Sequence, residues 1–281
     1  MSKVVVCLPV YNGMQYIERC IKSVLEQSFT DFEFAIFVNE SSDETLEFCL
    51  DVARRDSRIT VYPAERFLTA TENFQRAWDF AEQAASYFLI IAHDDYISPN
   101  YLHECVNALE RDKQKMLAAP SVSYVSSIGV KGIFFDKRIL NLDNFLVPFS
   151  IRRISFPASW FYGVYRKGST VTISEALQLY PDGWGVDRLC VQLFLLRDKI
   201  VFCEDARIFV QTGSDSAKKY MQKSFTGQVS ARFTYFNALW AQRSYLKLST
   251  IGAKISFWMT CLATSAHDTN YTIERIILRK K

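Results

Sequence analysis

A continuous apolar run ends abruptly at two adjacent acids in the first half of the chain. Residues Tyr87–Ala92 carry no charge, and Asp94 and Asp95 follow after a single histidine. Such a run is typical of a strand covered on both faces, as in a parallel sheet between helices. Ligands of such sheets bind beyond the carboxyl ends of the strands, so the two acids are candidates for holding a divalent cation and its phosphates. Alternatively, the pair only marks a loop before the helix that begins near Pro99.

Apolar runs and amphipathic helical faces alternate along the first part of the chain. The expected strands are Val4–Leu8, Phe34–Val38, Ile59–Tyr62 and Tyr87–Ala92. One helix should begin near Tyr16, and three more should cover Leu46–Ala53, Phe74–Ala81 and Leu102–Leu109. This repeating order of strand and helix predicts an α/β fold with a parallel sheet and right-handed crossovers.

The pattern loosens after the helix that contains Leu109. Residues 117–170 mix short β-like runs with basic and aromatic residues, which favours an irregular region over the sheet. Helices near 174–179 and 187–196 and a strand at Ile200–Cys203 should follow. From Tyr220 onward the chain is helical in pattern, and we interpret this part as an appendage.

The composition narrows the class of protein. An apolar fraction of 49% and a charged fraction of 22% are typical of a soluble globular chain, and a net charge of +3 argues against a general nucleic-acid binder. The seven cysteines show no CxxC spacing, which favours reduced core residues in the cytosol over disulfides or a zinc site. We expect no signal peptide, and no apolar run reaches the roughly 18 residues of a membrane-spanning helix.

Three motifs follow three of the expected strands. They are Leu-Pro-Val-Tyr-Asn at 8–12, Asn-Glu-Ser-Ser-Asp-Glu-Thr at 39–45 and His-Asp-Asp-Tyr-Ile-Ser-Pro-Asn-Tyr-Leu at 93–102. Together they resemble the family 2 glycosyltransferases of the GT-A fold, as do the shorter matches at 73–76, 161–166 and 185–188. The resemblance covers about residues 3–216 and implies a Rossmann-like, mostly parallel sheet with flanking helices.

The resemblance also implies a division of the chain and a reaction. Residues 1–216 would form the GT-A domain, with a nucleotide-binding half at 1–115 and an acceptor half at 116–216, and residues 217–281 a helical region. The implied reaction moves a sugar, with inversion, from a UDP- or dTDP-linked nucleotide-sugar to a saccharide acceptor, lipid-linked in many relatives that build surface polysaccharides such as O-antigen, capsule or exopolysaccharide.

Several site residues can be assigned from the resemblance. Asp95 matches the acid that holds the family's Mg²⁺ or Mn²⁺, and Asp94 its neighbour, which reaches the ribose or a metal-bound water. Pro9 and Tyr11 would pack beside the base. Asn39 stands where the family commonly has an aspartate that hydrogen-bonds the base. Asn73 belongs to the same donor pocket, although turn chemistry is the alternative role for Tyr11 and Asn39.

The chain departs from the family pattern at several positions. Val38 replaces a companion acid, Phe67 a usual glycine and Glu72 a usual arginine, while Val210 and Thr212 stand where many relatives have arginine and histidine. These departures leave open which nucleobase the donor carries. They also support an alternative function, in which a catalytically silent GT-A domain binds nucleotide-sugars or glycans as a scaffold.

Inversion in one displacement requires a base that takes the acceptor's hydroxyl proton. Asp187 matches the family's acid at the start of a helix after a glycine-rich aromatic turn, and Asp182 in that turn is the rival. Alternatively, Asp187 only stabilises the N-terminus of its helix. Trp160 and Tyr162 offer faces for sugar stacking, although such aromatics more often belong to the core.

The last segment with a clear pattern is 251–266, which is too short and polar to span a bilayer but long enough to lie on one. Its expected apolar side consists of Ile251, Ile255, Phe257, Trp258, Met259 and Leu262. Basic residues follow at 275, 279, 280 and 281. Two hypotheses follow for this segment: a peripheral contact with the inner face of the cytoplasmic membrane, or packing on the domain or homodimerisation.

Overall fold

The computed structural model describes residues 3–133, 140, 156–179, 185–212, 225–246, 248 and 250–268. The chain forms two compact units. The first unit comprises Met1–Ile133, Tyr162–Val171 and Ile200–Ser214, and the second comprises Phe134–Phe161, Thr172–Lys199 and Asp215–Lys281. The domain boundaries expected from the sequence, at 115 and 216, stay predictions.

A mixed sheet forms the centre of the first unit. The strands are β1 Val4–Val10, β2 Phe32–Val38, β3 Ile59–Pro63, β4 Tyr87–Ile90, β5 Tyr96–Ile97, β6 Leu117–Ser126, β7 Gly129–Gly132, β8 Val164–Arg166 and β9 Ile200–Gln211. Their order in the described sheet is β3-β2-β1-β4-β8-β6-β9-β5, and β7 pairs with β6. Strands β1 to β4 pair in parallel, as predicted, whereas β8 runs antiparallel to β4 and β6.

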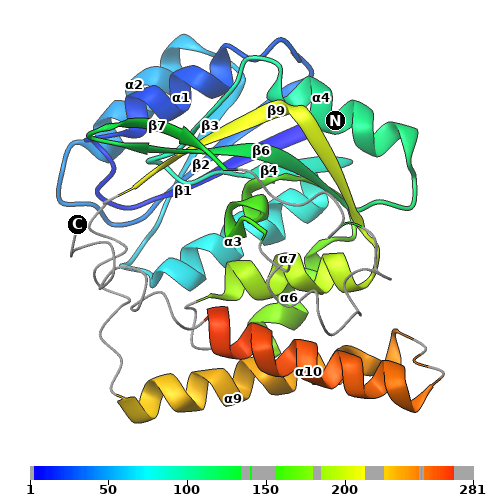
Figure 1. Ribbon diagram of the computed structural model, residues 1–281. Coiled ribbons are helices and arrows are strands. Elements are labelled where there is room, and N and C mark those ends of the chain that lie inside the picture. Colours follow the sequence, from blue (N-terminus) through cyan, green and yellow to red (C-terminus); the bar gives the residue numbers. More distant parts are fainter. Residues whose placement is uncertain are drawn as a thin grey trace. The chain divides into compact units, whose positions relative to one another are not determined.

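Four helices cover the two faces of this sheet. They are α1 Ile17–Leu25, α2 Thr45–Arg55, α3 Ala70–Ala84 and α4 Tyr101–Arg111. Helices α1 and α2 lie on one face and α3 on the other (Figure 1). The chain steps outward from β1 to β3 and then returns past β1 to β4, so right-handed crossovers place α3 on the opposite face. The strand order therefore reverses between β1 and β4, which is where ligands of open α/β sheets bind.

The buried patterns explain why these segments form strands and helices. All seven residues of β1 and all four of β4 are buried, as expected for strands with helices on both faces. Helix α3 begins with a capping box between Thr69 and Glu72 and buries Ala77, Trp78 and Ala81. The strand and helix order predicted for residues 4–111 is confirmed, except that the two-residue strand β5 was not expected and β4 ends at Ile90 instead of Ala92.

The expectation of an irregular region at 117–170 is wrong for its first ten residues. Strand β6 pairs in parallel with β9 and antiparallel with β8, inside the sheet. Its first four residues are all buried, so they lack the alternation that marks a half-exposed strand. Pro120 lies in the middle, and the pairing register with β9 shifts between Pro120 and Ser121, which is a usual place for proline within a sheet.

The second unit is helical in its described residues. It contains α7 Val186–Leu196, α9 Phe225–Ala241 and α10 Ile251–Asp268, together with most of α6 Thr170–Leu179. Helix α7 is buried continuously from Leu189 to Leu196, and the Tyr235 hydroxyl of α9 donates to Gln192 Oε1 at 2.8 Å. Helices α9 and α10 pack together, with Trp240 stacked on Phe257 at 5.9 Å between ring centroids. The helical appendage expected after Tyr220 thus contains two long helices.

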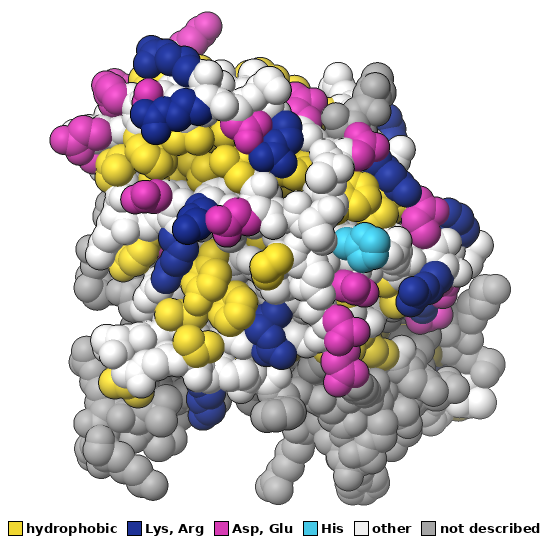
Figure 2. Space-filling view, turned by 90° about the horizontal axis from the view of Figure 1, so that it is seen from above, with side chains coloured by type: hydrophobic (Ala, Val, Ile, Leu, Met, Phe, Trp, Pro, Cys, Tyr) yellow, Lys and Arg dark blue, Asp and Glu magenta, His cyan; other side chains and the backbone are white. Residues whose placement is uncertain are grey.

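Two further expectations concern the cysteines and the membrane. All seven cysteines are buried and carry free thiols, as expected for reduced core residues. None of the helices in the described part of the chain is long and apolar enough to cross a bilayer. Basic and acidic side chains are interspersed over the face seen in Figure 2, as expected for a chain of small net charge.

Candidate functional site

Hydrogen bonds join the loops that follow β1 and β2. The Gly13 amide donates to the Thr45 hydroxyl at 2.8 Å, and the Met14 amide donates to Asp43 Oδ2 at 3.1 Å. Partial burial tends to raise the pKa of Asp43, but hydrogen bonds from Thr45 and Met14 outweigh it and lower the pKa below its ordinary value. The two loops therefore form one connected rim at the carboxyl ends of β1 and β2.

Two aromatic side chains stand exposed at this rim. Tyr11, directly after β1, is 40% exposed, and Phe67, after β3, is 53% exposed. Their rings meet edge to face with centroids 5.4 Å apart. Pro9, by contrast, is buried inside β1 opposite Phe37 of β2. Tyr11 is thus exposed to solvent at the rim, while Pro9 belongs to the buried strand that precedes it.

The two predicted amides of the donor pocket are buried. Asn39 Nδ2 donates to the Leu68 carbonyl at 2.7 Å, and its Oδ1 accepts from the Leu68 amide at 2.9 Å. Asn73 Nδ2 donates to the Phe37 carbonyl at 3.0 Å, and its Oδ1 accepts from Arg76 at 3.2 Å. Both side chains therefore bond to neighbouring parts of the first unit and hold the loop and helix that follow β3.

The two acids lie in the short connection between β4 and β5. Asp95 is 2% exposed, and its Oδ1 accepts from the Gln211 amide at 2.9 Å, while Asp94 is half-buried. Burial, with a smaller contribution from Asp94, raises the pKa of Asp95 well above its ordinary value, although the Gln211 amide and Arg19 lower it in part. Two carboxylates at one buried strand end are an environment that a divalent cation would stabilise.

Arg19 and Gln211 complete this end of the sheet, and the sequence did not single them out. Arg19 donates to the Asp94 carbonyl oxygen and to Gln211 Oε1, each at 3.1 Å, and its guanidinium lies 4.4 Å from the Tyr96 ring centroid. Tyr96 in turn stacks on Phe209 at 4.5 Å. The one indication of Gln211 in the sequence was that its neighbours Val210 and Thr212 depart from the family pattern.

Asp187 lies in the second unit. It is half-buried in the first turn of α7, after Gly185, whose φ of 81° lies in the left-handed region that glycine adopts readily. Its rival Asp182 lies outside the described residues. Trp160 is fully buried and stacks on Phe156 at 6.1 Å, so the expectation that its face is open to a sugar is wrong. Its neighbour Tyr162 is half-buried.

Curated relatives match the first part of the chain. A glycosyltransferase GlyA of Streptococcus pneumoniae is 27% identical over 102 residues, which is 36% of this chain and 14% of the relative. A chondroitin synthase of Pasteurella multocida is 29% identical over 106 residues, which is 38% of this chain and 11% of the relative. EpsJ of Bacillus subtilis, described as an uncharacterised glycosyltransferase, is 28% identical over 38% of this chain and 30% of its own length. The chain thus spans less than a third of each of these relatives.

The fold resembles that of S. aureus TarS. The structure of TarS 1–349 with UDP has a TM-score of 0.57 and 14% identity, covering 94% of this chain and 91% of that one. The complex with UDP-GlcNAc has a TM-score of 0.54. At this identity the likeness shows the fold alone, which is the expected GT-A arrangement. The family model described as glycosyl transferase family 2 matches residues 5–169, more than half of the chain. The chain therefore belongs to glycosyl transferase family 2.

Proposed function

We propose that this chain is an inverting glycosyltransferase, which moves a sugar from a UDP- or dTDP-linked donor to a saccharide acceptor during surface polysaccharide synthesis. The observation that carries the proposal is the position of Asp94 and Asp95 at the reversal of strand order between β1 and β4. The family supports it, as do relatives named chondroitin synthase and hyaluronan synthase and a fold neighbour solved with UDP-GlcNAc.

The chemistry of this strand end fits Mg²⁺ or Mn²⁺. Asp95 offers carboxylate oxygen, and Asp94 stands beside it. The described residues contain no group of three or more His, Cys, Asp or Glu side chains arranged for a metal. One or two carboxylates are enough for these ions, because water and substrate phosphates supply the other ligands. A bound cation would act as a Lewis acid that neutralises charge on the leaving diphosphate.

The protein side chains bind the donor and move one proton. Tyr11 contacts the nucleobase. Pro9 is buried in β1, and Asn39 and Asn73 hydrogen-bond the backbone of Leu68 and Phe37, so these three residues stabilise the walls of the donor pocket. Asp187 takes the proton of the acceptor hydroxyl as the new glycosidic bond forms and the bond to the diphosphate breaks. In this scheme residues 1–115 bind the donor and residues 116–216 bind the acceptor.

Calorimetric titration tests the donor site. Wild type should bind UDP or dTDP and their sugar conjugates only when Mn²⁺ or Mg²⁺ is present. Asp95→Ala should abolish this metal-dependent binding while the protein still melts cooperatively. Asp205→Ala is the matched control, because Asp205 is an exposed acid on β9. Unchanged affinity and metal dependence in the Asp95 variant would show that the metal assignment is wrong.

The outer face of α10 is the proposed contact with an anionic membrane that presents a lipid-linked acceptor. Its exposed apolar residues recur at helical spacing and are Ile251, Ile255, Trp258, Met259 and Leu262. Phe257 was expected on this face but is 1% exposed and packs against α9. The exposed face fits a helix that lies in the interface, and the basic residues after 274 add attraction of about 1 kcal/mol for each cation near an anionic surface.

Co-sedimentation with anionic liposomes tests this contact. Wild type should bind at low salt and dissociate at high salt, and a chain truncated after Ser249 should not bind. Replacing Ile251, Ile255 and Trp258 with serine should also prevent binding, whereas Val171→Ser, at an equally exposed site of the first unit, should not. A wild-type chain that fails to bind, or that forms a dimer through these three residues instead, would assign the face to protein packing.

A further inference from the structure

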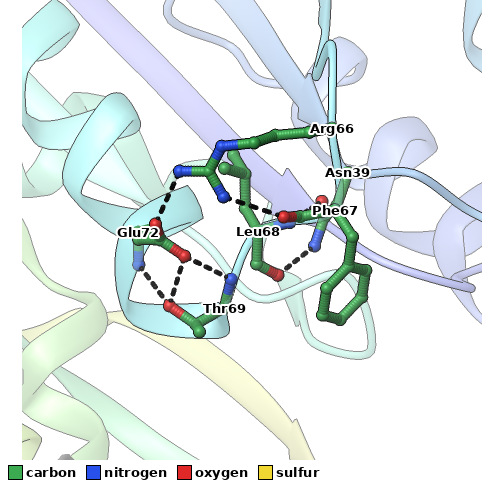
Figure 3. Close-up of polar contacts among 6 residues, drawn as sticks. All are labelled: Asn39, Arg66, Phe67, Leu68, Thr69 and Glu72. Atoms are coloured by element: carbon green, nitrogen blue, oxygen red, sulfur yellow. Dashed lines mark hydrogen bonds and ion pairs between the residues drawn. The ribbon is translucent and has the colours of Figure 1, made fainter.

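The loop Arg66–Thr69, between β3 and α3, is fixed along its length (Figure 3). Asn39 bonds to both the amide and the carbonyl of Leu68, at 2.9 and 2.7 Å. Thr69 forms the capping box with Glu72. Arg66 donates to Glu72 Oε1 at 2.8 Å and to the Phe67 carbonyl at 3.0 Å. The backbone of the loop therefore has little freedom.

This fixed loop keeps the side chain of Phe67 exposed to solvent. Its side chain is 53% exposed, whereas that of Leu68 is 8% exposed. Burying a phenylalanine side chain fully would stabilise the fold, and at this position part of that gain is absent. The only ring that Phe67 contacts among the described residues is that of Tyr11, which is itself 40% exposed. The loop thus presents an aromatic surface at the carboxyl end of β1.

The side-chain amide of Asn39, unlike the ring of Phe67, is not exposed to solvent. The residue is 4% exposed, and its oxygen accepts from Glu40 at 3.0 Å in addition to Leu68. A flat ligand above the loop would therefore meet the rings of Phe67 and Tyr11, while the hydrogen-bonding groups of Asn39 face the backbone of the chain.

We propose that the ring of Phe67, with Tyr11 packed edge to face against it, is the platform on which the base of a nucleoside diphosphate stacks, and that Asn39 is a positioning residue that holds Phe67 in place. This inference rests on the proposed function. Stacking uses the face that all bases share, so recognition by these two rings discriminates weakly between bases. UDP, dTDP, GDP and ADP should therefore bind with dissociation constants within roughly tenfold of one another.

Titration of these four diphosphates and of pyrophosphate, each with Mn²⁺, tests the platform. Phe67→Leu keeps an apolar side chain but removes the ring, and it should weaken every nucleoside diphosphate by roughly 5- to 150-fold, the worth of one stacked base. It should leave the affinity for pyrophosphate unchanged, and Phe67→Tyr should bind like wild type. Phe233→Leu is the matched control, because Phe233 is an exposed phenylalanine on α9.

A double-mutant cycle tests the role of Asn39. Asn39→Ala should lower both stability and nucleotide affinity in the wild-type background. In the Phe67→Leu background it should still lower stability but cause no further loss of affinity, because it acts through the missing ring. An equal loss of affinity in both backgrounds would show that Asn39 contacts the base directly.

The outcomes separate this inference from the proposed function. A wild-type chain that binds none of the four diphosphates would overturn the proposed donor class. A wild-type chain that binds them, with Phe67→Leu binding equally well, would overturn only the platform. Strong preference for one base, retained in the Phe67 variant, would do the same.

Discussion

The substitution Asn39→Asp introduces the residue that family relatives commonly carry, and we expect it to destabilise this chain. In wild type the Asn39 amide nitrogen donates to the Leu68 carbonyl at 2.7 Å, while its oxygen accepts from the amides of Leu68 and Glu40. An ionised carboxylate keeps both accepted bonds. It also places a negatively charged oxygen against the Leu68 carbonyl, which then has lost its donor.

The expected loss in the free energy of unfolding near neutral pH is about 1–3 kcal/mol, the usual cost of leaving a buried hydrogen-bonding group, here the Leu68 carbonyl, without its partner. Protonation of the new carboxyl restores a donor, so its pKa in the folded state lies above the unfolded value of about 3.9. The deficit is therefore small below that unfolded pKa and grows as the pH rises through the folded pKa.

Urea unfolding of wild type, Asn39→Asp and Asn39→Ala across acidic to neutral pH measures this effect. The alanine variant lacks all three hydrogen bonds of the Asn39 side chain at every pH. Its free energy of unfolding should therefore differ from that of wild type by an amount that does not change with pH. The aspartate variant should approach wild-type stability in acid and lose it toward neutral pH. An aspartate variant as stable as wild type at neutral pH would refute the reasoning from the Leu68 contacts.

Three further predictions concern other parts of the chain. Asp187→Asn should keep donor binding but slow transfer by roughly 10² to 10⁴, as measured by single-turnover kinetics, and near-normal turnover would move the base elsewhere. Gly13→Ala should destabilise the chain by about 1–3 kcal/mol in urea unfolding, because the added Cβ would lie 3.1 Å from the His93 ring and closer still to β1. The pKa of Glu72 is lowered to about 2, chiefly by Arg66, so the ionised Glu72 stabilises the fold above its unfolded pKa and loses this effect as the pH falls through its folded pKa. In Glu72→Gln the free energy of unfolding, measured with urea, should therefore depend less on pH in the acid range.

The strand and helix order was predictable because each segment of residues 4–111 carries its own periodic pattern. Strand β1 is apolar throughout and entirely buried, so the sequence and the structure agree with little ambiguity. Strand β2 begins at Phe32, two residues earlier than expected, because acidic Glu33 interrupts the apolar run. Strand β6 was expected only as a short β-like run in an irregular region, because its first half contains Ala118, Ala119 and Pro120, which are poor strand formers.

The candidate site was predictable only where it follows from strand ends. Tyr11 directly follows β1, and Asp95 lies in the connection after its parallel neighbour β4, so topology places both at the carboxyl ends of these strands. Arg19 and Gln211 were not predictable, because the hydrogen bond between them joins residues 192 positions apart. The hydrogen bonds between Asn39 and the backbone of Leu68 were also not predictable, since only the fold brings these two residues together.

The departures from the family pattern near α3 form one coupled arrangement. Glu72 stands in place of a usual arginine, and it closes the capping box of α3 and pairs with Arg66. Phe67 stands in place of a usual glycine, and the loop that carries it is bonded to Asn39. Among the described residues, the buried side-chain polar atoms without a hydrogen-bond partner all belong to α7, α10 and Arg197, and none to this loop. The substituted residues thus satisfy one another's hydrogen bonds, as buried polar groups in native structures generally do, and the loop keeps an ordered shape that differs from the family pattern.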